Sequence, residues 1–302
     1  MIYPESQICE FIEKALLSEV YTTPKPGLVD KHDTGAHRDM DVSTFEKSTA
    51  AISPFLAKMY GAGVEFSENP ENLCDEKLFA VIRKIGVDAE KAMFAATNGV
   101  NTHKGIIFTL GIICASLGFT LKRHKNLQND FFDDSDELID DFLDEVFLNA
   151  KKMTFETLEK DFALMASREP KTHGEKLFAK YGEKGIRGEA QKGFPIIYKV
   201  ALPFYKKLLK VNPDENNRNI IALLHIVKNL SDTNVLSRSS PETLRWLQSE
   251  CDSILGEKTV FAPEDIERVC KLNEECVQKN ISPGGAADIL AVTVFLAAVS
   301  GL

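Results

Sequence analysis

Apolar residues recur at intervals of three and four along most of the chain, a spacing that places them on one face of an α-helix. The pattern is clearest over residues 75–97, where Leu78, Ile82, Ile85 and Ala89 lie about one turn apart. The same periodicity predicts further helices over residues 6–20, 44–60, 136–153, 154–167, 174–181, 190–210, 215–230, 241–253 and 263–279. No regular series of alternating apolar and polar residues predicts strands. The pattern indicates an all-α protein.

Two windows, residues 105–121 and 286–299, are apolar almost throughout and carry hardly any charge. A helix that is apolar on every face must be buried, so we expect these two at the centre of the molecule. The first window falls slightly short of the roughly 20 residues that a membrane span needs, and three glycines dilute it. We therefore predict one compact multi-helix domain over residues 1–302.

Residues 22–41 interrupt the helical pattern. Pro24 and Pro26 favour an extended backbone, and Gly27 and Gly35 allow turns. Ionisable side chains crowd this segment: Lys25, Asp30, Lys31, His32, Asp33, His37, Arg38, Asp39 and Asp41. Clustered carboxylates repel one another unless a cation or a substrate holds them, which indicates a site for a hard metal ion. A polar surface loop that caps the next helix is the alternative.

Two other polar clusters open the apolar windows. At residues 101–105, Lys104 and the first helical amides could bind a phosphate; a capping turn with a surface His103 is equally compatible with the spacing. At residues 282–288, Gly284 and Gly285 allow a ligand to approach the backbone. Asp288 follows inside an uncharged helix, where a carboxylate needs a partner, and this favours a functional role.

Two further clusters lie at predicted helix ends. Arg187 and Glu189 flank a glycine, and they could form a substrate site or a surface salt bridge. Asp232 and Asn234 follow the predicted helix over residues 215–230, and they offer oxygen ligands or ordinary turn-forming side chains. The acidic run over residues 133–145 is typical of a solvated helix face.

Net charge and cysteine usage narrow the class of protein. The chain has 302 residues and a formal charge of −9, which argues against general nucleic-acid binding. Its six cysteines include no C-x-x-C pair, and the first residues lack the basic and apolar regions of a secretory signal. We expect a reduced, cytoplasmic compartment.

Five of these stretches together resemble the triphosphoribosyl-dephospho-coenzyme-A synthase family. The matching pieces are Thr-Pro-Lys-Pro-Gly-Leu-Val-Asp with Gly-Ala-His-Arg-Asp-Met-Asp, Asn-Thr-His-Lys-Gly, Gly-Ile-Arg-Gly-Glu-Ala, Asp-Thr-Asn-Val-Leu and Ser-Pro-Gly-Gly-Ala-Ala-Asp. They occur in the family's order between residues 22 and 288. One departure is that Arg238, Ser239 and Ser240 stand where such proteins often carry a glycine pair.

The resemblance implies an all-helical enzyme that joins the triphosphoribosyl part of ATP to dephospho-coenzyme A and releases adenine. The product is the prosthetic-group precursor for the acyl carrier subunit of citrate lyase or malonate decarboxylase. It implies ATP and dephospho-coenzyme A as small-molecule partners and Mg²⁺ as the cofactor. No nucleic acid or membrane is implied, and a homodimer is left open.

This chemistry assigns expected roles to residues. The metal candidates are Asp30, Asp39, Asp41 and Asp288, because Mg²⁺ prefers hard carboxylate oxygens. The expected phosphate and substrate contacts are Lys25, Arg38, Lys104, Arg187, Asp232, Asn234, Gly284 and Gly285. Glu189 or an aspartate of residues 22–41 would be the base, and His37 or His103 would supply a proton or donor to the leaving adenine.

Two other functions remain as alternatives. The doublet His32-Asp33 suggests a metal-dependent phosphohydrolase of the HD type, although it lies in a loop and further ligands are not obvious. A non-catalytic helical adaptor would expose an apolar patch instead. The proposed chemistry requires that residues 22–41 and the turn at 282–288, which lie at opposite ends of the chain, converge in one pocket.

Overall fold

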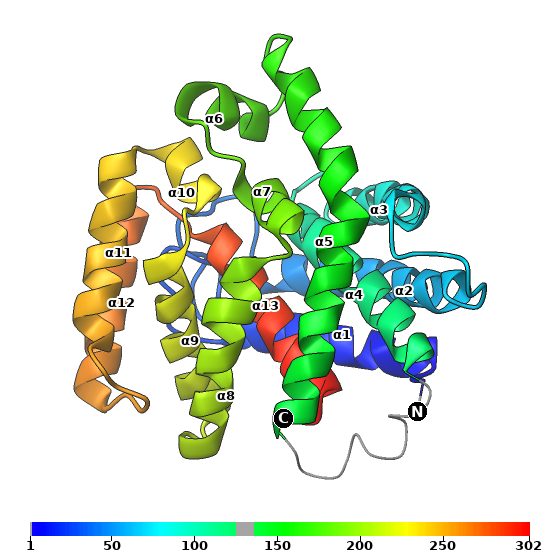
Figure 1. Cartoon of the computed structure of the whole chain (residues 1–302). Helices are drawn as coiled ribbons and strands as arrows, with labels where there is room; N and C mark the ends of the chain where they lie inside the picture. The colour runs from blue at the N-terminus through cyan, green and yellow to red at the C-terminus, as the bar shows by residue number, and fades with distance from the viewer. Residues whose placement is uncertain (1, 125–135) are drawn as a thin grey trace.

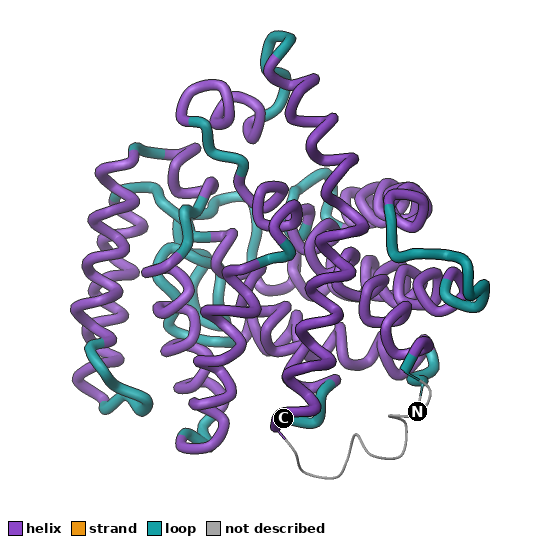
Figure 2. The backbone as a smooth tube through the Cα atoms, viewed as in Figure 1, coloured by secondary structure: helices purple, strands orange, loops and turns teal. Residues whose placement is uncertain are grey.

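The structure is a computed structural model that describes residues 2–124 and 136–302. Within these ranges the chain forms thirteen α-helices and one π-helical segment, and no strand (Figure 2). The elements are α1 (Glu5–Tyr21), α2 (Val42–Phe66), α3 (Glu76–Ala96), α4 (Lys104–Arg123), α5 (Asp136–Ala166), α6 (His173–Tyr181), α7 (Gly185–Lys192), η2 (Ile196–Ala201), α8 (Leu202–Val211), α9 (Glu215–Asn229), α10 (Thr233–Arg238), α11 (Pro241–Leu255), α12 (Pro263–Gln278) and α13 (Gly284–Val299). The all-α prediction is confirmed.

The two apolar windows form α4 and α13, the central helices of the bundle (Figure 1). Helix α4 packs against α2, α3, α5, α7 and α13, while α13 packs against α1, α4, α8, α9, α10 and η2. Helix α4 is long and apolar enough to cross a membrane, but 78% of its apolar window is buried inside the molecule. Both helices therefore serve as the core that the pattern predicted.

Residues 125–135, which hold the start of the acidic run, lie outside the described residues. Helix α5 follows as one helix, so the predicted break between residues 153 and 154 is wrong. Thr154 lies inside α5. Its Oγ1 donates to the carbonyl of Ala150 in the same helix and to that of Ala190 in α7, each at 2.9 Å. The hydroxyl is satisfied inside the helix and has no need of a turn.

The predicted single helix over residues 190–210 is also wrong. Helix α7 ends at Gly193, which adopts a left-handed conformation at φ +82°, and Phe194 follows at φ +57°. The π-helical segment η2 and helix α8 come next. Periodicity continues across such a break, because the apolar residues on both sides still face the core.

Two helix starts differ from the prediction. Asp232 does not close the helix before it; its carboxylate accepts from the amide of Asn234 at 2.8 Å and begins the short helix α10. Helix α13 begins at Gly284, two residues earlier than predicted. Helix α2 runs to Phe66 and contains Pro54 without being split.

The two ends of the chain meet, as the predicted chemistry requires. The Nε2 of His37 lies 2.9 Å from the hydroxyl of Ser282. The amide of Gly27 donates to the side chain of Asn273, and the amide of that asparagine donates to Asp33. The loop over residues 22–41 is therefore fixed against the start of α13.

Candidate functional site

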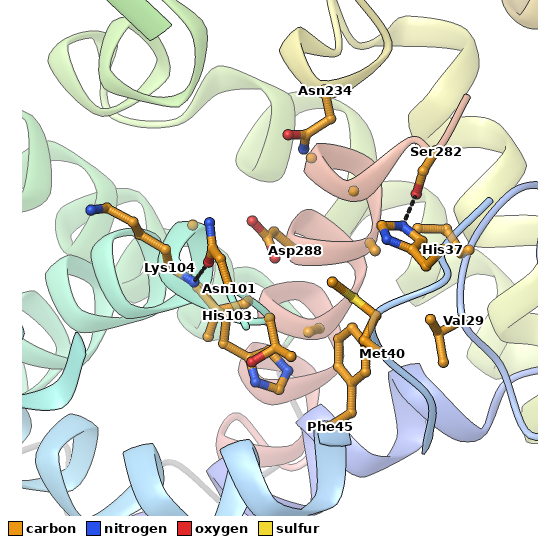
Figure 3. A pocket seen from close by; sticks show the side chains of 18 of the residues that line it. Val29, His37, Met40, Phe45, Asn101, His103, Lys104, Asn234, Ser282 and Asp288 are labelled. Carbon is orange, nitrogen blue, oxygen red and sulfur yellow. Dashed lines mark hydrogen bonds between the residues drawn. The ribbon is translucent and has the colours of Figure 1, made fainter. Parts of the chain in front are cut away.

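A pocket of about 440 Å³ opens where the loop over residues 22–41 meets several helix starts (Figure 3). Helices α4, α10 and α13 all begin in its wall, with Lys104, Thr233 and Gly284 among the lining residues. The start of a helix presents amide N–H groups and the positive end of the helix dipole. Three such starts around one cavity favour a ligand that carries negative charge.

Asp288, the fifth residue of α13, projects into the pocket (Figure 3). None of the described residues donates a hydrogen bond to its carboxylate, which is partly accessible through the pocket. Burial raises its pKa well above the ordinary value, and the carboxylates of Glu19 and Asp232 raise it further. Asp288 is therefore an acidic group without a partner that faces the ligand space.

Gly105 makes room for this carboxylate. A methyl group at position 105 would lie 2.0 Å from Oδ2 of Asp288, well inside contact distance. The glycine of the Asn-Thr-His-Lys-Gly stretch thus lets the start of α4 approach α13 closely. The backbone of Gly105 has ordinary helical geometry, so the position needs glycine for the space beside Asp288 and not for an unusual backbone conformation.

A buried ion pair forms the inner end of the pocket. Lys25 is 0% exposed, and its ammonium donates to the carboxylate of Glu19 and, at 2.7 Å, to the carbonyl of the same residue. Glu19 lies in the last turn of α1, where the helix dipole disfavours an acid, and Lys25 offsets this. Glu19 lines the pocket and Lys25 does not, so Lys25 affects the pocket only by pairing with the carboxylate of Glu19.

His103 faces the pocket beside this pair. Thr102 donates its hydroxyl proton to Ser48, and the Ser48 hydroxyl lies 2.7 Å from Nδ1 of His103. The tautomer in which Ser48 donates to Nδ1 carries the ring proton on Nε2. Burial, with the nearby charge of Lys25, lowers the pKa of His103 to about 3, so the ring is neutral near pH 7.

At the mouth of the pocket, Arg238 and His37 lie together. The guanidinium of Arg238 donates to the carbonyl of Ala36 at 3.2 Å and lies 3.4 Å from Nδ1 of His37. Burial and the charge of Arg238 lower the pKa of His37, while Asp39 opposes the shift. The mouth therefore carries a fixed cation beside a neutral imidazole.

Asp232 joins the starts of two helices. It is 1% exposed, and its carboxylate accepts from the amides of Asn234 and Val235 in α10 and of Ala286 in α13. Burial raises its pKa to about 6, although these amides act in the opposite direction. Methyl groups on Gly284 and Gly285 would lie 2.9 and 3.0 Å from the side chains of Asn234 and Asp232, so the diglycine permits this junction.

The pocket brings together about half of the predicted site residues. Those that line it are His37, Asp39, His103, Lys104, Asn234, Gly284, Gly285 and Asp288. Lys104 contributes mainly its stem, because its ammonium pairs with Glu90 at 2.8 Å. Asp232 and Glu189 line a neighbouring pocket, and Arg187 lies in a third one beside Asp161 and Phe79.

Four predicted residues line none of these three pockets: Lys25, Asp30, Arg38 and Asp41. Asp30 is 2% exposed, and its two oxygens accept from Thr23 Oγ1 and from the amides of Lys25, His32 and Asp33 at 2.8–3.0 Å. Asp41 is exposed and caps α2, accepting from the amide of Thr44 at 2.9 Å. Both carboxylates hold local backbone.

The His32-Asp33 doublet lies within the same loop. Asp33 accepts from the amide of Gly35 at 2.7 Å and from the side chain of Asn273 at the same distance. Among the residues that the structure describes, no group of three or more His, Cys, Asp or Glu side chains is placed to hold a metal ion by itself. The arrangement that an HD-type site requires is therefore missing from the described part of the chain.

Several pocket residues were not predicted: Glu19, Asn101, Thr102, Thr233, Arg238 and Ser282. Most belong to the stretches that carry the resemblance, where only their neighbours received roles. Glu19 had a signal of its own, an acid in the last turn of an otherwise apolar helix end. Arg238 had none, because its contact with Ala36 joins positions about 200 residues apart.

These features define a class of protein: an all-helical enzyme with a polar pocket built for an anionic ligand. The chain belongs to the ATP:dephospho-CoA triphosphoribosyl transferase family, whose model matches residues 5–302. It is therefore a transferase, as the resemblance implied.

Individual relatives match along nearly the whole chain. The 2-(5''-triphosphoribosyl)-3'-dephosphocoenzyme-A synthase of Escherichia fergusonii is 35% identical over 96% of this chain and 89% of its own. The synthase of the same name from Haemophilus ducreyi is 34% identical over 97% of this chain and 88% of its own. A crystal structure from Archaeoglobus fulgidus is similar at a TM-score of 0.47 and 16% identity, over 84% of this chain and 98% of that one.

Proposed function

We propose that this protein transfers the triphosphoribosyl group of ATP to a ribosyl hydroxyl of dephospho-coenzyme A and releases adenine. The observation that carries the proposal is the pocket at the starts of α4, α10 and α13, with Asp288 unpaired inside it. Triphosphate is the most strongly charged part of ATP, and the pocket offers the guanidinium of Arg238 together with the positive end of the dipole of α4. Lys104 joins them if its ammonium leaves Glu90.

Magnesium ion fits the donors of this pocket. Asp288 and Glu19 offer hard carboxylate oxygens, and Asp39 lines the outer part. Because the described side chains include no three-ligand group, phosphate oxygens and water would complete the shell, as is usual for Mg²⁺ in nucleotide sites. When bound, the ion neutralises phosphate charge. Of the four predicted metal ligands, we retain Asp39 and Asp288, and we add Glu19.

The reaction replaces one bond at the anomeric carbon of ATP's ribose by another. The acceptor oxygen bonds to this carbon, the bond to adenine breaks, and positive charge develops on the ribose between the two events. Asp288 is suited to stabilise that charge through an oxygen that does not hold the ion, because none of the described residues donates to its carboxylate. Neutral His103 can hydrogen-bond the departing adenine through its ring N–H, and adenine takes up its proton from solvent. Both ring nitrogens of His37 are engaged, by Ser282 and by Arg238.

The acceptor hydroxyl must lose a proton, and Glu189 is the candidate base. Burial raises the pKa of its carboxyl, while one oxygen accepts from the amide of Ile196 at 2.9 Å. A raised pKa brings a carboxylate closer to the range in which a general base works best. Glu189 lines the pocket adjacent to the main one, where an acceptor could lie.

The biological setting belongs to the same proposal. The product would be the prosthetic-group precursor for the acyl carrier protein of citrate lyase or malonate decarboxylase. A cytoplasmic location agrees with six free cysteines. We further propose that the enzyme acts on small molecules without nucleic acid or membrane.

The test is to incubate the purified protein with ATP, Mg²⁺ and dephospho-coenzyme A and to quantify adenine, inorganic phosphate and the coupled product by chromatography. We expect adenine and coupled product in equal amounts, no phosphate, and loss of both when Mg²⁺ is chelated. Omitting dephospho-coenzyme A controls for hydrolysis of ATP. Release of phosphate without adenine would indicate a phosphohydrolase and would overturn the proposal.

A further inference from the structure

A second pocket of about 360 Å³ lies beside the main one, between α7 and the segment that joins α9 to α10. Its volume, like that of the main pocket, falls within the range of small-molecule sites, roughly 300–1,000 Å³. Lys184, Glu189 and Lys192 line one side, and Asn229 and Ser231 line the other. The second pocket thus has its own polar lining.

The two pockets share a wall. Ile186, Thr233 and Gly285 line both cavities, so the partition between them is about one residue thick. Gly285 has no side chain, and Gly185, at φ +54°, brings the start of α7 against the methyl group of Thr233. A molecule in either pocket therefore lies within reach of a molecule in the other.

The lining of the second pocket suits the nucleotide end of a coenzyme. Glu189 uses one oxygen for the amide of Ile196, and none of the described residues donates to the other. That oxygen can accept from a ribose hydroxyl or a base amine. Lys192 is exposed at the rim, where its ammonium can meet phosphate, and Lys184 lies nearby with its own ammonium donating to Gln191 at 3.1 Å.

The main pocket suits the other substrate better. The residues proposed to act on the donor, Asp288 and His103, line the main pocket and are absent from the lining of the second one, whereas the proposed base Glu189 lines only the second. A base must lie beside the hydroxyl that it deprotonates. This division assigns the donor to the main pocket and the acceptor to the second one.

We infer that the second pocket binds the adenosine diphosphate end of dephospho-coenzyme A, with its ribose facing the wall formed by Ile186, Thr233 and Gly285. This inference rests on the proposed function, because it requires two nucleotide substrates. It explains why the chain builds two polar cavities that share residues. The hydroxyl that attacks would reach the anomeric carbon of ATP across Gly285, where the wall carries no side chain.

A steric substitution tests the assignment. Ser231 is exposed, lines the second pocket and is absent from the lining of the main one, so S231F should obstruct only the acceptor. We expect the KM for dephospho-coenzyme A to rise about tenfold or more, with the KM for ATP within about twofold. S237F is the matched control, because Ser237 is an exposed serine of α10 that lines neither pocket.

A reciprocal variant and a direct binding measurement complete the test. Arg238 lines only the main pocket of the two, so R238A should raise the KM for ATP and leave that for the acceptor nearly unchanged. Calorimetric titration with dephospho-coenzyme A alone should show binding to the wild type and to R238A, and weakened binding to S231F.

Two outcomes separate the hypotheses. One outcome is that S231F raises the KM for ATP as much as the KM for dephospho-coenzyme A, or changes neither KM, while the wild type still releases adenine. The pocket assignment is then wrong and the proposed function stands. If the wild type neither binds dephospho-coenzyme A nor releases adenine, the proposed function itself fails. Should S231F unfold, as judged by circular dichroism, K192A at the exposed rim replaces it with the same expected direction.

Discussion

The loop over residues 22–41 and the turn that opens α13 are both rich in glycine, proline and acid, yet they use their carboxylates differently. In the loop, Asp30 accepts four hydrogen bonds and Asp41 caps a helix. In the turn, Asp288 has no donor among the described residues and faces the pocket. A carboxylate that is already satisfied by backbone amides is held as structure, whereas an unsatisfied one is available to a ligand.

This difference shows that the density of acidic residues is a poor guide to a binding site. Within the loop, the side chains of Thr23, Asp30 and Asp33 hydrogen-bond to the loop itself or to Asn273 of α12, and the ionisable side chains that the loop contributes to the pocket are His37 and Asp39. The single carboxylate of α13 lies in an apolar helix, where nothing else explains its presence. The contrast can be tested by substitutions in each region.

The largest effect is expected for D288N. The substitution keeps the shape of the side chain but removes the charge that would face the ribose and the metal, so adenine release should fall about 1,000-fold or more. The midpoint of thermal unfolding should stay the same or rise, because burial disfavours the charge in the free protein. Activity within a few-fold of the wild type would remove Asp288 from the site.

For D30N we expect a large loss of stability and a smaller direct loss of activity, the reverse of D288N. Its oxygens hold the amides of Lys25, His32 and Asp33, and an amide nitrogen in place of one oxygen would face donors. The free energy of unfolding should fall by about 3 kcal/mol, measured by urea denaturation. Any loss of activity should be recovered in part at low temperature or with stabilising osmolyte, which would not happen if Asp30 bound the metal.

The smallest effect is expected for D41A. Asp41 is an exposed helix cap, and loss of a cap typically costs about 1 kcal/mol of stability. Adenine release at saturating substrate should be unchanged, in contrast to D288N. A loss of activity comparable to that of D288N would mean that the loop does supply a metal ligand, and the contrast between the two regions would then be lost.

The sequence was sufficient for the fold class because helical periodicity is local. Each helix repeats its apolar face every three to four residues, and α4 and α13 could be placed at the centre by their lack of charge. The break after Lys192 and the short helix α10 were missed, because they depend on the left-handed Gly193 and on a capping contact by Asp232. Neither interrupts the apolar pattern.

The site was only partly predictable for a related reason. His103 and Asp288 lie in short motifs near helix starts, and His37 lies in the loop rich in proline and glycine, so their type and position already indicated chemistry. Whether a side chain is free depends on partners far along the chain, as with Lys25, which Glu19 engages, or Arg187, which lies beside another cavity. Sequence spacing does not contain that information.

Asp232 has a practical consequence for redesign. Because one buried carboxylate fastens the starts of α10 and α13, and Thr233 and Gly285 beside it border both cavities, the wall between the chambers cannot be reshaped for one of them alone. An engineer who wished to admit a different acceptor by altering positions 232 and 233 would also shift the starts of α10 and α13, which line the donor's pocket. Selecting for altered acceptors is therefore expected to yield compensating changes at the diglycine, on the other side of the partition.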